Sequence, residues 1–540
     1  MEFLMDMVHH NPGEAPFETS FLEPQKLKEY GFNAQVFKHI NTALTLEDYD
    51  SELSYDNAAH EWLKNWSSNI TNEIKKAKGA GLKVYYHIDL FVLPKAVKEK
   101  YWKEICDENG KISLRKEKTL EIHRALFDEM FRRFPDVDGL IIRVGETYLH
   151  DTPFHTGDGA IQYGNPEQEK KDFIYLLNFL REEICEKHDR YLFFRTWDCF
   201  PDRFHANAKY YLDITENVET HAKLLFSIKH TALDFWRRVK FNECLTLGKH
   251  RQIVEVQCQR EYEGKGAYPS YVMNGVINSF EENSSPKGLR DIAHHPLIAG
   301  LYTWSRGGGW FGPYPKNEFW CDLNTYVIAQ YGQNPSRTEE EIFFTYAEEK
   351  MNLVPKDAKC FRDLCLLIPL AVLKGRYIEY YDRTLNESFM PCGNWMRDDR
   401  IGGLQQLNNI IEYLYKNDLL HSAVVEKQES VLLWQKIKEL FEGITIPNKE
   451  LHSFIETSID YAIGLFRIAE TAWKVMEIGF IAEKTGRVDK EALNEAIQAY
   501  DTAWVSYNSV TKRSSSSTPY QPEYLHEPGV GATIDKYRTV

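Results

Sequence analysis

Short apolar runs alternate with amphipathic stretches over the first 330 residues of the chain. Eight of these runs have the length and composition of buried strands, and most are separated by enough chain to form a helix. They cover residues 3–8, 32–37, 82–88, 137–144, 190–197, 223–230, 252–259 and 297–304. Eight strand-and-helix units in succession are typical of a (β/α)8 barrel. We therefore predict an α/β fold with such a barrel over residues 1–330.

From about residue 336 the apolar spacing becomes helical and strand-like runs end. Ser336 and Glu339 have the spacing of a capping box that opens a helix. The segment 458–483 is apolar around most of its circumference, which predicts a buried helix. We therefore predict a C-terminal all-α helical domain over residues 331–510. Four serines in succession and scattered Pro and Gly then predict an extended surface tail over residues 511–540.

The composition and charge exclude several classes of partner. The 540 residues include 65 Lys or Arg and 80 Asp or Glu, so the net charge is −15. A chain this acidic is expected to bind neither nucleic acid nor an anionic membrane surface. No apolar run reaches the roughly 18 residues that a membrane span needs. Aromatic residues make up 14% of the chain, which fits either large cores or platforms for sugar rings.

The nine cysteines show no CxxC motif and no ligand spacing with histidine, so we expect neither a disulfide framework nor a zinc site. His87 with Asp89 and the adjacent His9 and His10 lack the spacing of an amidohydrolase centre, so we expect no metal and no cofactor. The N-terminus shows no basic region followed by a long apolar segment. This predicts a cytoplasmic protein, or a periplasmic one from which a signal peptide has been removed. A homodimer is compatible with the sequence.

Polar and ionisable residues gather at the C-terminal ends of the predicted strands, which is where barrels of this kind carry their chemistry. One such residue would mean little, but together they outline a polar pocket. The carboxylates that we select as candidate catalytic residues are Glu146, Asp234 and Glu261. The candidate substrate-binding residues are His10, Asn41, Arg195, Asp198, Lys229, Gln257 and Trp304.

The seventh predicted strand is the most informative of the eight. Its polar residues recur at every second position and therefore share one face of the strand; they are Glu255, Gln257, Gln259 and Glu261. The intervening residues are apolar and should face the surrounding helices, which leaves the polar face for the barrel interior. Burying such groups costs free energy unless they are paired or functional. A structural polar network and a binding site are both open explanations.

Carboxylates at three strand ends suit general acid and base work on a glycosidic bond. Arg195 and Lys229 lie on the strands between these carboxylates. A neutral sugar does not need two cations, whereas the carboxylate of a uronic acid must be bound when it leaves water. The alternative for both cations is a salt bridge to the nearby acids.

Five segments together resemble glycoside hydrolase family 67, the α-glucuronidases. They are IVEVQCQREYEG (253–264), SIKHTALDFW (227–236), FFRTW (193–197), GLIIRVGET (139–147) and YVIAQYGQNP (326–335). The resemblance implies that Glu146 is the general acid and that Asp234 and Glu261 flank the nucleophilic water. It also implies that Arg195 and Lys229 hold the uronate carboxylate.

The chain departs from that family at several points. It begins inside the first strand, where family members usually carry a β-rich domain. His10 stands where the family has a stacking Trp, and Gly145–Glu146 replaces a longer motif after strand four. These departures concern the sugar and its linkage more than the reaction type.

We therefore expect an inverting glycoside hydrolase that releases α-linked glucuronic acid, or its 4-O-methyl form, from short oligosaccharides such as xylan fragments. The alternatives are a glycosidase of the same fold that acts on a different uronide or a neutral glycoside, and a carbohydrate-binding barrel without catalysis.

Overall fold

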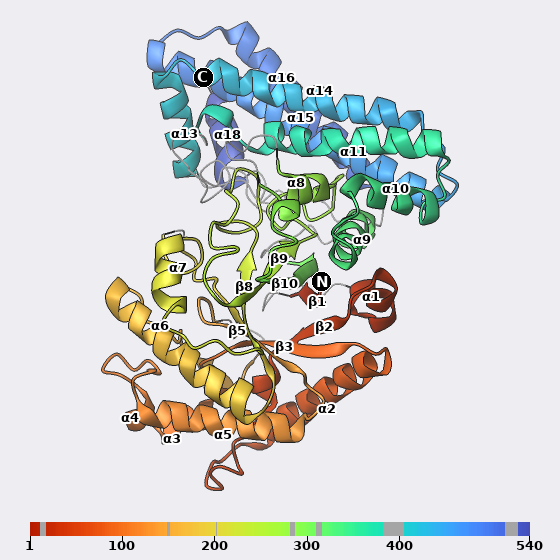
Figure 1. The fold of residues 1–540 in the computed structure, drawn as a ribbon. Helices are drawn as coiled ribbons and strands as arrows, with labels where there is room; N and C mark the ends of the chain where they lie inside the picture. The colour runs from red at the N-terminus through yellow and green to blue at the C-terminus, as the bar shows by residue number, and fades with distance from the viewer. Residues whose placement is uncertain are drawn as a thin grey trace.

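The computed structural model describes residues 1–10, 18–147, 149, 152–200, 202–280, 287–308, 316–381, 404–513 and 527–539. Its lower half in Figure 1 is a barrel surrounded by helices, and a layer of long helices lies against one end of that barrel. The fold is therefore a (β/α)8 barrel followed by a helical region, as the apolar pattern predicts.

All eight predicted strands are confirmed. They are β1 (Phe3–His9), β2 (Ala34–Lys38), β3 (Lys83–Asp89), β5 (Gly139–Arg143), β7 (Tyr191–Arg195), β8 (Leu224–Lys229), β9 (Arg251–Gln257) and β10 (Ile298–Gly307). They form a closed parallel barrel in the order β1-β10-β9-β8-β7-β5-β3-β2. Because β1 pairs with both β2 and β10, no strand edge of this barrel is left open.

Helices cover the outside of the barrel between its strands. They are η1 (Ser20–Leu22), α1 (Pro24–Tyr30), η2 (Ile40–Ala43), α2 (Asn57–Gly79), α3 (Lys95–Lys100), α4 (Trp102–Ile105), α5 (Glu117–Arg133), α6 (Pro166–Leu180), η3 (Arg181–Lys187), α7 (Ala208–Thr215), α8 (Met273–Asn278) and η4 (Leu289–Asp291). A short antiparallel pair, β4 (Val92–Pro94) with β6 (His155–Gly157), joins the loops that follow β3 and β5. The sequence pattern did not predict this pair.

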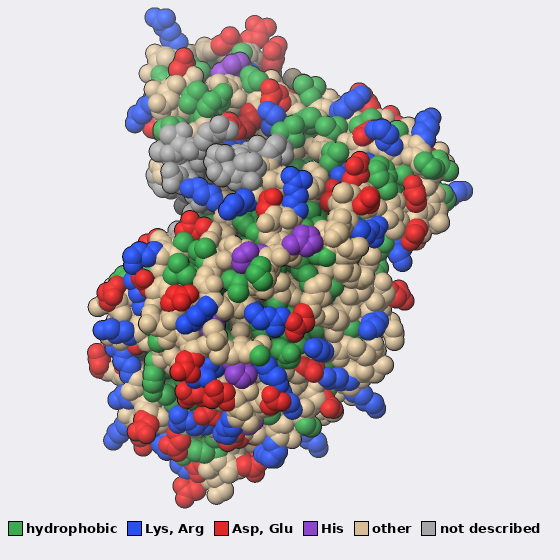
Figure 2. Space-filling view, viewed as in Figure 1, with side chains coloured by type: hydrophobic (Ala, Val, Ile, Leu, Met, Phe, Trp, Pro, Cys, Tyr) green, Lys and Arg blue, Asp and Glu red, His purple; other side chains and the backbone are tan. Residues whose placement is uncertain are grey.

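Two apolar clusters fill the barrel domain, one inside the ring of strands and one between strands and helices. Phe3, Met5 and Met7 of β1 belong to the inner cluster, whereas Leu4 and Val8 belong to the outer one. This alternation is the period of two that an extended strand imposes on its side chains. Acidic and basic side chains are interspersed over the visible surface of the barrel (Figure 2).

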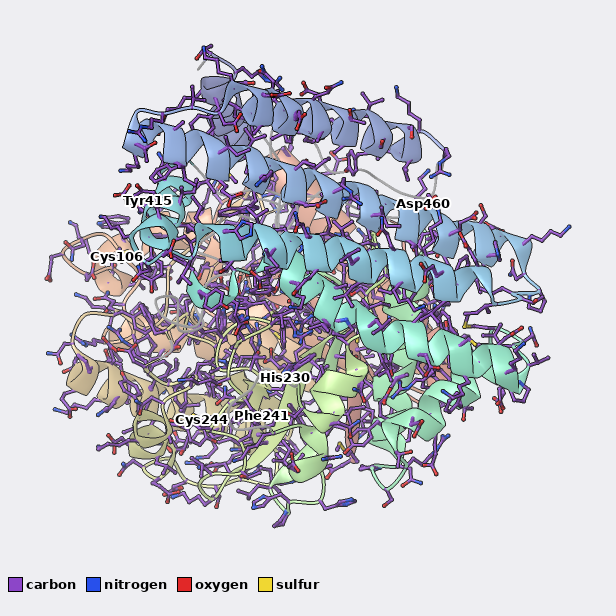
Figure 3. The ribbon with its side chains drawn as sticks, turned by 90° about the horizontal axis from the view of Figure 1, so that it is seen from above. Cys106, His230, Phe241, Cys244, Tyr415 and Asp460 are labelled. Atoms are coloured by element: carbon purple, nitrogen blue, oxygen red, sulfur yellow. The ribbon has the colours of Figure 1, made fainter. Side chains whose placement is uncertain are left out.

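The C-terminal region is helical, as predicted. It contains α9 (Phe319–Gln333), α10 (Glu339–Glu349), α11 (Pro355–Arg376), α13 (Leu404–Lys416), α14 (Leu420–Glu442), α15 (Lys449–Thr485) and α16 (Lys490–Thr511). Seen from above, the long helices run side by side, and His230, Phe241 and Cys244 of the barrel domain lie beside them in the view (Figure 3). Asn448 caps the start of α15, and Gly486 ends it in the left-handed conformation.

Two expectations for this region are wrong. The capping box that opens α10 is formed by Thr338 and Glu341, two residues after the predicted position. The tail is not extended throughout: after η6 (Glu527–Gly531), Ala532–Tyr537 forms helix α18. Its Tyr537 ring packs against Gly479 of α15, where an added Cβ would lie 2.4 Å from the ring. The run of four serines in the predicted tail, residues 514–517, lies outside the described residues.

Among the helices that the structure describes, none is long and apolar enough to cross a membrane.

Candidate active site

Glu146 lies three residues beyond β5, at the C-terminal end of the barrel. Its carboxylate accepts hydrogen bonds from Trp197 Nε1 at 3.1 Å and from Arg143 Nη1 at 3.4 Å. Arg143 is held in turn by a buried two-bond pair with Asp89. The Glu146 side chain is 29% exposed, so it combines fixed partners with access to solvent. These are the properties that proton exchange with a bound substrate requires.

The glycine before Glu146 is a steric requirement. A Cβ on Gly145 would lie 2.4 Å from the carbonyl oxygen of Trp197, a distance that side chains do not tolerate. The loop after β5 can therefore pass directly beside the loop after β7 only because residue 145 lacks a side chain. This close approach lets Trp197 reach the Glu146 carboxylate.

Asp234 lies on the loop after β8 and forms an ion pair with Lys229, the last residue of that strand. Its other carboxylate oxygen accepts a hydrogen bond from the Tyr262 hydroxyl at 2.7 Å. The Lys229 ammonium lies 3.3 Å from the centroid of the Trp197 ring. Trp197 therefore contacts Glu146 through its Nε1 and Lys229, the ion-pair partner of Asp234, through its face. Glu146 and Asp234 are linked through one indole and one ammonium.

Glu261 lies four residues beyond the end of β9, next to the end of β10. Its backbone N–H donates to Gln257 Oε1 at 2.9 Å. Its carboxylate lies beside Gly308, where an added Cβ would be 2.5 Å from Glu261 Oε2 and 2.7 Å from Gln257 Nε2. Glu261 is only 6% exposed. The third candidate carboxylate thus occupies the β9–β10 side of the barrel end and is more buried than the other two.

The predicted interior face of β9 is confirmed, and its first polar residue belongs to a buried network. Glu255 accepts two hydrogen bonds at 2.8 Å from Arg195 and one at 2.7 Å from Ser227. Arg195 is 1% exposed, and its guanidinium lies 5.1 Å from the centroid of the Trp304 ring. The salt bridges that were the alternative for Arg195 and Lys229 are both present in the structure. A uronate carboxylate would have to share these cations with Glu255 and Asp234.

Trp304 is enclosed rather than open as a stacking platform. Its ring stacks on His9 at a centroid distance of 4.4 Å and meets the edge of Phe235 at 5.2 Å. With Arg195 also against the ring, only the Nε1 atom remains unpartnered, and it is buried. Trp304 therefore forms part of the floor beneath the candidate carboxylates.

Several buried polar atoms of this floor lack a hydrogen-bond partner. They are Nδ1 of His9, Nδ1 of His87, Nε2 of Gln257 and Nε1 of Trp304. Burial, reinforced by nearby Lys and Arg side chains, lowers the pKa of His9 and of His87 well below the ordinary value. Both imidazoles are therefore neutral near neutral pH and can donate or accept one hydrogen bond each. Leaving such groups unpaired costs about 1–3 kcal/mol each, a cost that the hydroxyls of a bound sugar would remove.

Two predicted binding residues, Asn41 and Asp198, form hydrogen bonds to backbone groups. Asn41 donates from its amide to the carbonyls of Asp89 at 3.2 Å and Val92 at 3.5 Å. Asp198 accepts the N–H groups of Phe200 and Phe204, at 3.2 and 2.9 Å. These bonds shape the loops after β3 and β7.

The backbone carbonyl of His10, a third predicted binding residue, accepts a hydrogen bond from Lys38 Nζ at 2.5 Å. Burial raises the pKa of Asp198 to about 7. Substrate contacts by His10, Asn41 and Asp198 stay predictions.

The structure adds three residues that we did not select from the sequence. The sequence pattern could have indicated Trp197, because it lies two positions after Arg195 and therefore on the same face of the predicted strand. Tyr262 follows Glu261 in the motif after the seventh strand. Cys199 gave no signal in the sequence. Its thiol lies in the field of Glu146, Lys229 and Asp234, and burial together with both carboxylates raises its pKa.

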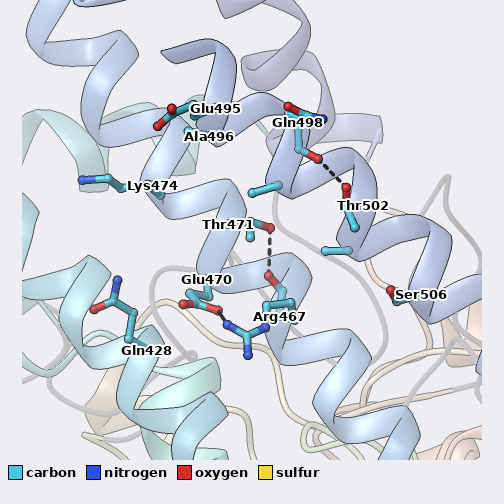
Figure 4. Close-up of a pocket in the computed structure, with 12 residues that line it drawn as sticks. Gln428, Arg467, Glu470, Thr471, Lys474, Glu495, Ala496, Gln498, Thr502 and Ser506 are labelled. Atoms are coloured by element: carbon cyan, nitrogen blue, oxygen red, sulfur yellow. Dashed lines mark hydrogen bonds and ion pairs between the residues drawn. The ribbon is translucent and has the colours of Figure 1, made fainter. Parts of the chain in front are cut away.

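Two other features bear on the site. Within the described part of the chain, no group of His, Cys, Asp and Glu side chains could hold a metal ion. A pocket of about 670 Å³ lies between α14, α15 and α16 (Figure 4). Its lining includes Arg467, Glu470 and Lys474 but none of the ten predicted site residues.

Comparison with known proteins bears on the fold. No protein-family model matches the chain, and neither does any curated protein. The chain is similar in structure to a GH138 enzyme targeting pectin rhamnogalacturonan II, with a TM-score of 0.57 and 11% identity over 100% of this chain and 67% of that one.

Two further solved structures are less similar to this chain. CpGH84B has a TM-score of 0.41 and 10% identity over 99% of this chain and 77% of that one. A mutant Thermobaculum terrenum O-GlcNAc hydrolase has a TM-score of 0.39 and 10% identity over 100% of this chain and 93% of that one. The GH138 likeness, at 11% identity, shows the fold alone, and the two with TM-scores below 0.5 add nothing to it. The resemblance to the α-glucuronidases of family 67 stays a prediction.

Proposed function

We propose that this protein is a glycoside hydrolase whose active site lies at the C-terminal end of the barrel. The observation that carries the proposal is the arrangement around Trp197. Trp197 donates to Glu146, which follows β5, and its face lies against the Lys229 ammonium, which pairs with Asp234 after β8. Two carboxylates brought to one polar, partly exposed site from different strands are the common requirement of glycosidic bond hydrolysis. The likeness to a GH138 fold supports the same reaction class.

In this mechanism Glu146 protonates the glycosidic oxygen as the bond to the leaving sugar breaks. Its 29% exposure and its bond from Trp197 keep the carboxyl accessible and oriented. Asp234 or Glu261 removes a proton from the attacking water on the opposite face of the sugar ring. Because the two acids would act on one water, they would titrate as a pair. An inverting reaction needs roughly 6.5–9.5 Å between acid and base, and the proposal requires this separation between Glu146 and the base.

We propose a uronide, in the first place an α-linked glucuronide of a short oligosaccharide, as the substrate. Arg195 and Lys229 are the last residues of β7 and β8, and Lys229 pairs with the candidate carboxylate Asp234. The named target of the structural neighbour, pectin rhamnogalacturonan II, adds pectin-derived fragments to the xylan-derived ones as substrates to test. The acidic net charge of −15 favours short fragments over a long polyanion.

A neutral glycoside is the second candidate, and one specific observation favours it. Both cations already have internal carboxylate partners, Glu255 for Arg195 and Asp234 for Lys229. A neutral sugar would leave these pairs undisturbed and would satisfy the unpaired atoms of Gln257, Trp304 and the two histidines with its hydroxyls.

The test is a comparison of matched substrates. Uronic-acid-capped xylan and pectin oligosaccharides are incubated with the protein beside the same compounds whose carboxylate has been reduced to an alcohol, and the released sugar is followed by NMR. Release from the acid forms only, with inversion at the anomeric carbon, supports the uronide proposal. Equal release from both forms selects the neutral-glycoside alternative. No release from either, with Glu146→Gln indistinguishable from the wild type, would contradict hydrolysis altogether.

A further inference from the structure

The loops that carry Asp234 and Glu261 are both held by the C-terminal end of helix α11 in the helical domain. Arg376 is the last residue of this helix and Tyr377 is its C-cap, and both side chains are buried. Neither residue belongs to the barrel. Their contacts cross from the helical domain to the loops after β8 and β9.

Tyr377 reaches both loops through one buried carboxylate. Its hydroxyl donates to Glu263 Oε1 at 2.6 Å and accepts the backbone N–H of Arg237 at 3.0 Å. Glu263 Oε1 accepts the same N–H at 2.9 Å, and Glu263 Oε2 accepts from Arg260 Nε at 2.9 Å. Arg237 lies three residues after Asp234, and Glu263 two residues after Glu261. One hydroxyl and one carboxylate thus tie the two candidate acid loops together.

Arg376 acts on the same loops by a second route. Its Nη1 donates to the carbonyl of Tyr262 at 2.8 Å, and its Nε donates to the hydroxyl of Tyr268 at 2.7 Å. The Tyr262 hydroxyl in turn donates to Asp234 at 2.7 Å. The two ends of Tyr262 are therefore bound by the helical domain and by a candidate catalytic carboxylate.

We propose that Tyr377 and Arg376 are positioning residues, through which the helical domain fixes Asp234 and Glu261 for catalysis. This role rests on the proposed hydrolase function of the barrel, and it gives the helical domain a part in the reaction. Arg376 contacts the backbone of Tyr262, and Tyr377 contacts Glu263 and the backbone of Arg237. Each acts through a chain of buried hydrogen bonds whose members are named above.

A positioning role predicts a specific change in kinetics. Displacing a catalytic group by about 1 Å can cost about a hundredfold in rate. Tyr377→Phe removes the hydroxyl that bonds Glu263 and leaves the bond from Arg376 to Tyr262 in place. We expect kcat to fall about tenfold with KM within about twofold of the wild type. A hydrogen bond to an ionised carboxylate favours its charged form. Loosening Tyr262 should therefore move the acidic limb of the pH–rate profile to higher pH, most clearly in Arg376→Lys, which cannot hold both of its acceptors.

The experiment compares Tyr377→Phe and Arg376→Lys with Tyr346→Phe as the matched control. Tyr346 is also buried in the helical domain and also donates to a carboxylate at 2.7 Å, but that carboxylate is Asp322 on α9. Kinetic constants and pH–rate profiles are measured on the most active substrate of the matched panel. The rate of Cys199 alkylation by iodoacetamide is measured by peptide mass spectrometry, because this thiol senses the charge of Asp234 without any turnover.

The results separate the inference from the function on which it rests. Burial, together with the carboxylates of Glu146 and Asp234, raises the pKa of the Cys199 thiol, so weakening the charged form of Asp234 should speed alkylation. A lower kcat, a shifted acidic limb and faster Cys199 alkylation in both variants, with the control unchanged, support the positioning role. An active wild type whose two variants keep its pH profile and its Cys199 rate overturns that role. If the wild type is inactive on every substrate, the hydrolase proposal fails. The rates of Cys199 alkylation then decide by themselves whether α11 holds the Asp234 loop. Faster alkylation then supports control of the Asp234 loop by α11, and an unchanged rate overturns it.

Discussion

Replacing Lys229 by Met tests whether this residue stabilises the fold, binds substrate or does both. The Lys229 side chain is 1% exposed and pairs with Asp234, which is 18% exposed. Its ammonium also lies 3.3, 5.3 and 5.6 Å from the centroids of the Trp197, Phe235 and Trp304 rings. The substitution removes the Lys229 ammonium from the Asp234 carboxylate and leaves the hydrogen bond from the Tyr262 hydroxyl in place.

The size of the effect follows from this burial. Removing one partner of a buried ion pair costs about 3–5 kcal/mol. Because Asp234 retains some contact with solvent, we expect a value near the lower end, about 3 kcal/mol, which is roughly a hundredfold change in the folding equilibrium. Methionine preserves most of the side-chain volume among the three rings, so little of the loss should come from a cavity.

The assay is urea unfolding followed by tryptophan fluorescence, since Trp197 and Trp304 adjoin the substituted residue. The control is Lys229→Met combined with Asp234→Asn, which removes both charges and should recover most of the lost stability. The reasoning is refuted if the single variant unfolds at the wild-type urea concentration. If it does so and yet loses its preference for the acidic over the reduced sugar, Lys229 serves the substrate and not the fold.

Three further predictions follow from the site. Glu146→Gln should lower turnover of unactivated substrates by about 10²–10⁴-fold and that of substrates with a very good leaving group much less; equal losses on both would exclude the acid role. Asp234→Ala and Glu261→Ala should each lose activity whatever the leaving group, and azide should restore only the variant that lacks the base, giving a glycosyl azide identified by NMR. Because burial raises the pKa of Asp198 from 3.8 to about 7, the folded state binds the extra proton between these values and its stability should fall as pH rises through that window. Asp198→Asn should remove this part of the slope, at most about 1.4 kcal/mol per pH unit, in unfolding experiments from pH 4 to 8; an unchanged slope would contradict the raised pKa.

The sequence predicted the barrel well because burial of its strands is visible in the chain itself. Each parallel strand is covered on both faces, so its residues form a continuous apolar run. On β9 the interior face could also be assigned, because polar residues at every second position cannot face the helices without cost. The order of the strands follows from the barrel rule and needs no further information.

The partners of the site residues could not be predicted in the same way. Arg195 and Glu255 belong to strands separated by β8, and their pairing exists only once the barrel has closed. The sequence therefore favoured substrate binding for Arg195 and left the salt bridge open as the alternative. The capping box of α10 was misplaced because Ser336 and Thr338 both precede an acidic residue by three positions, and only the structure shows where the helix begins. The role of Tyr377 depends on contacts about 140 residues apart, which no local pattern contains.

The pairing of β1 with β10 has a consequence for the time at which this protein can fold during its synthesis. All seven residues of β1 are buried, yet about 290 residues separate it from β10, the strand that completes its hydrogen bonding. At roughly 5–20 residues per second, the ribosome takes about 15–60 s to make the intervening chain. Through that interval β1 has one unpaired edge and apolar side chains on both faces, which are the features that promote pairing between different chains. The yield of soluble protein should therefore depend on chaperones that act before residue 307 has left the ribosome.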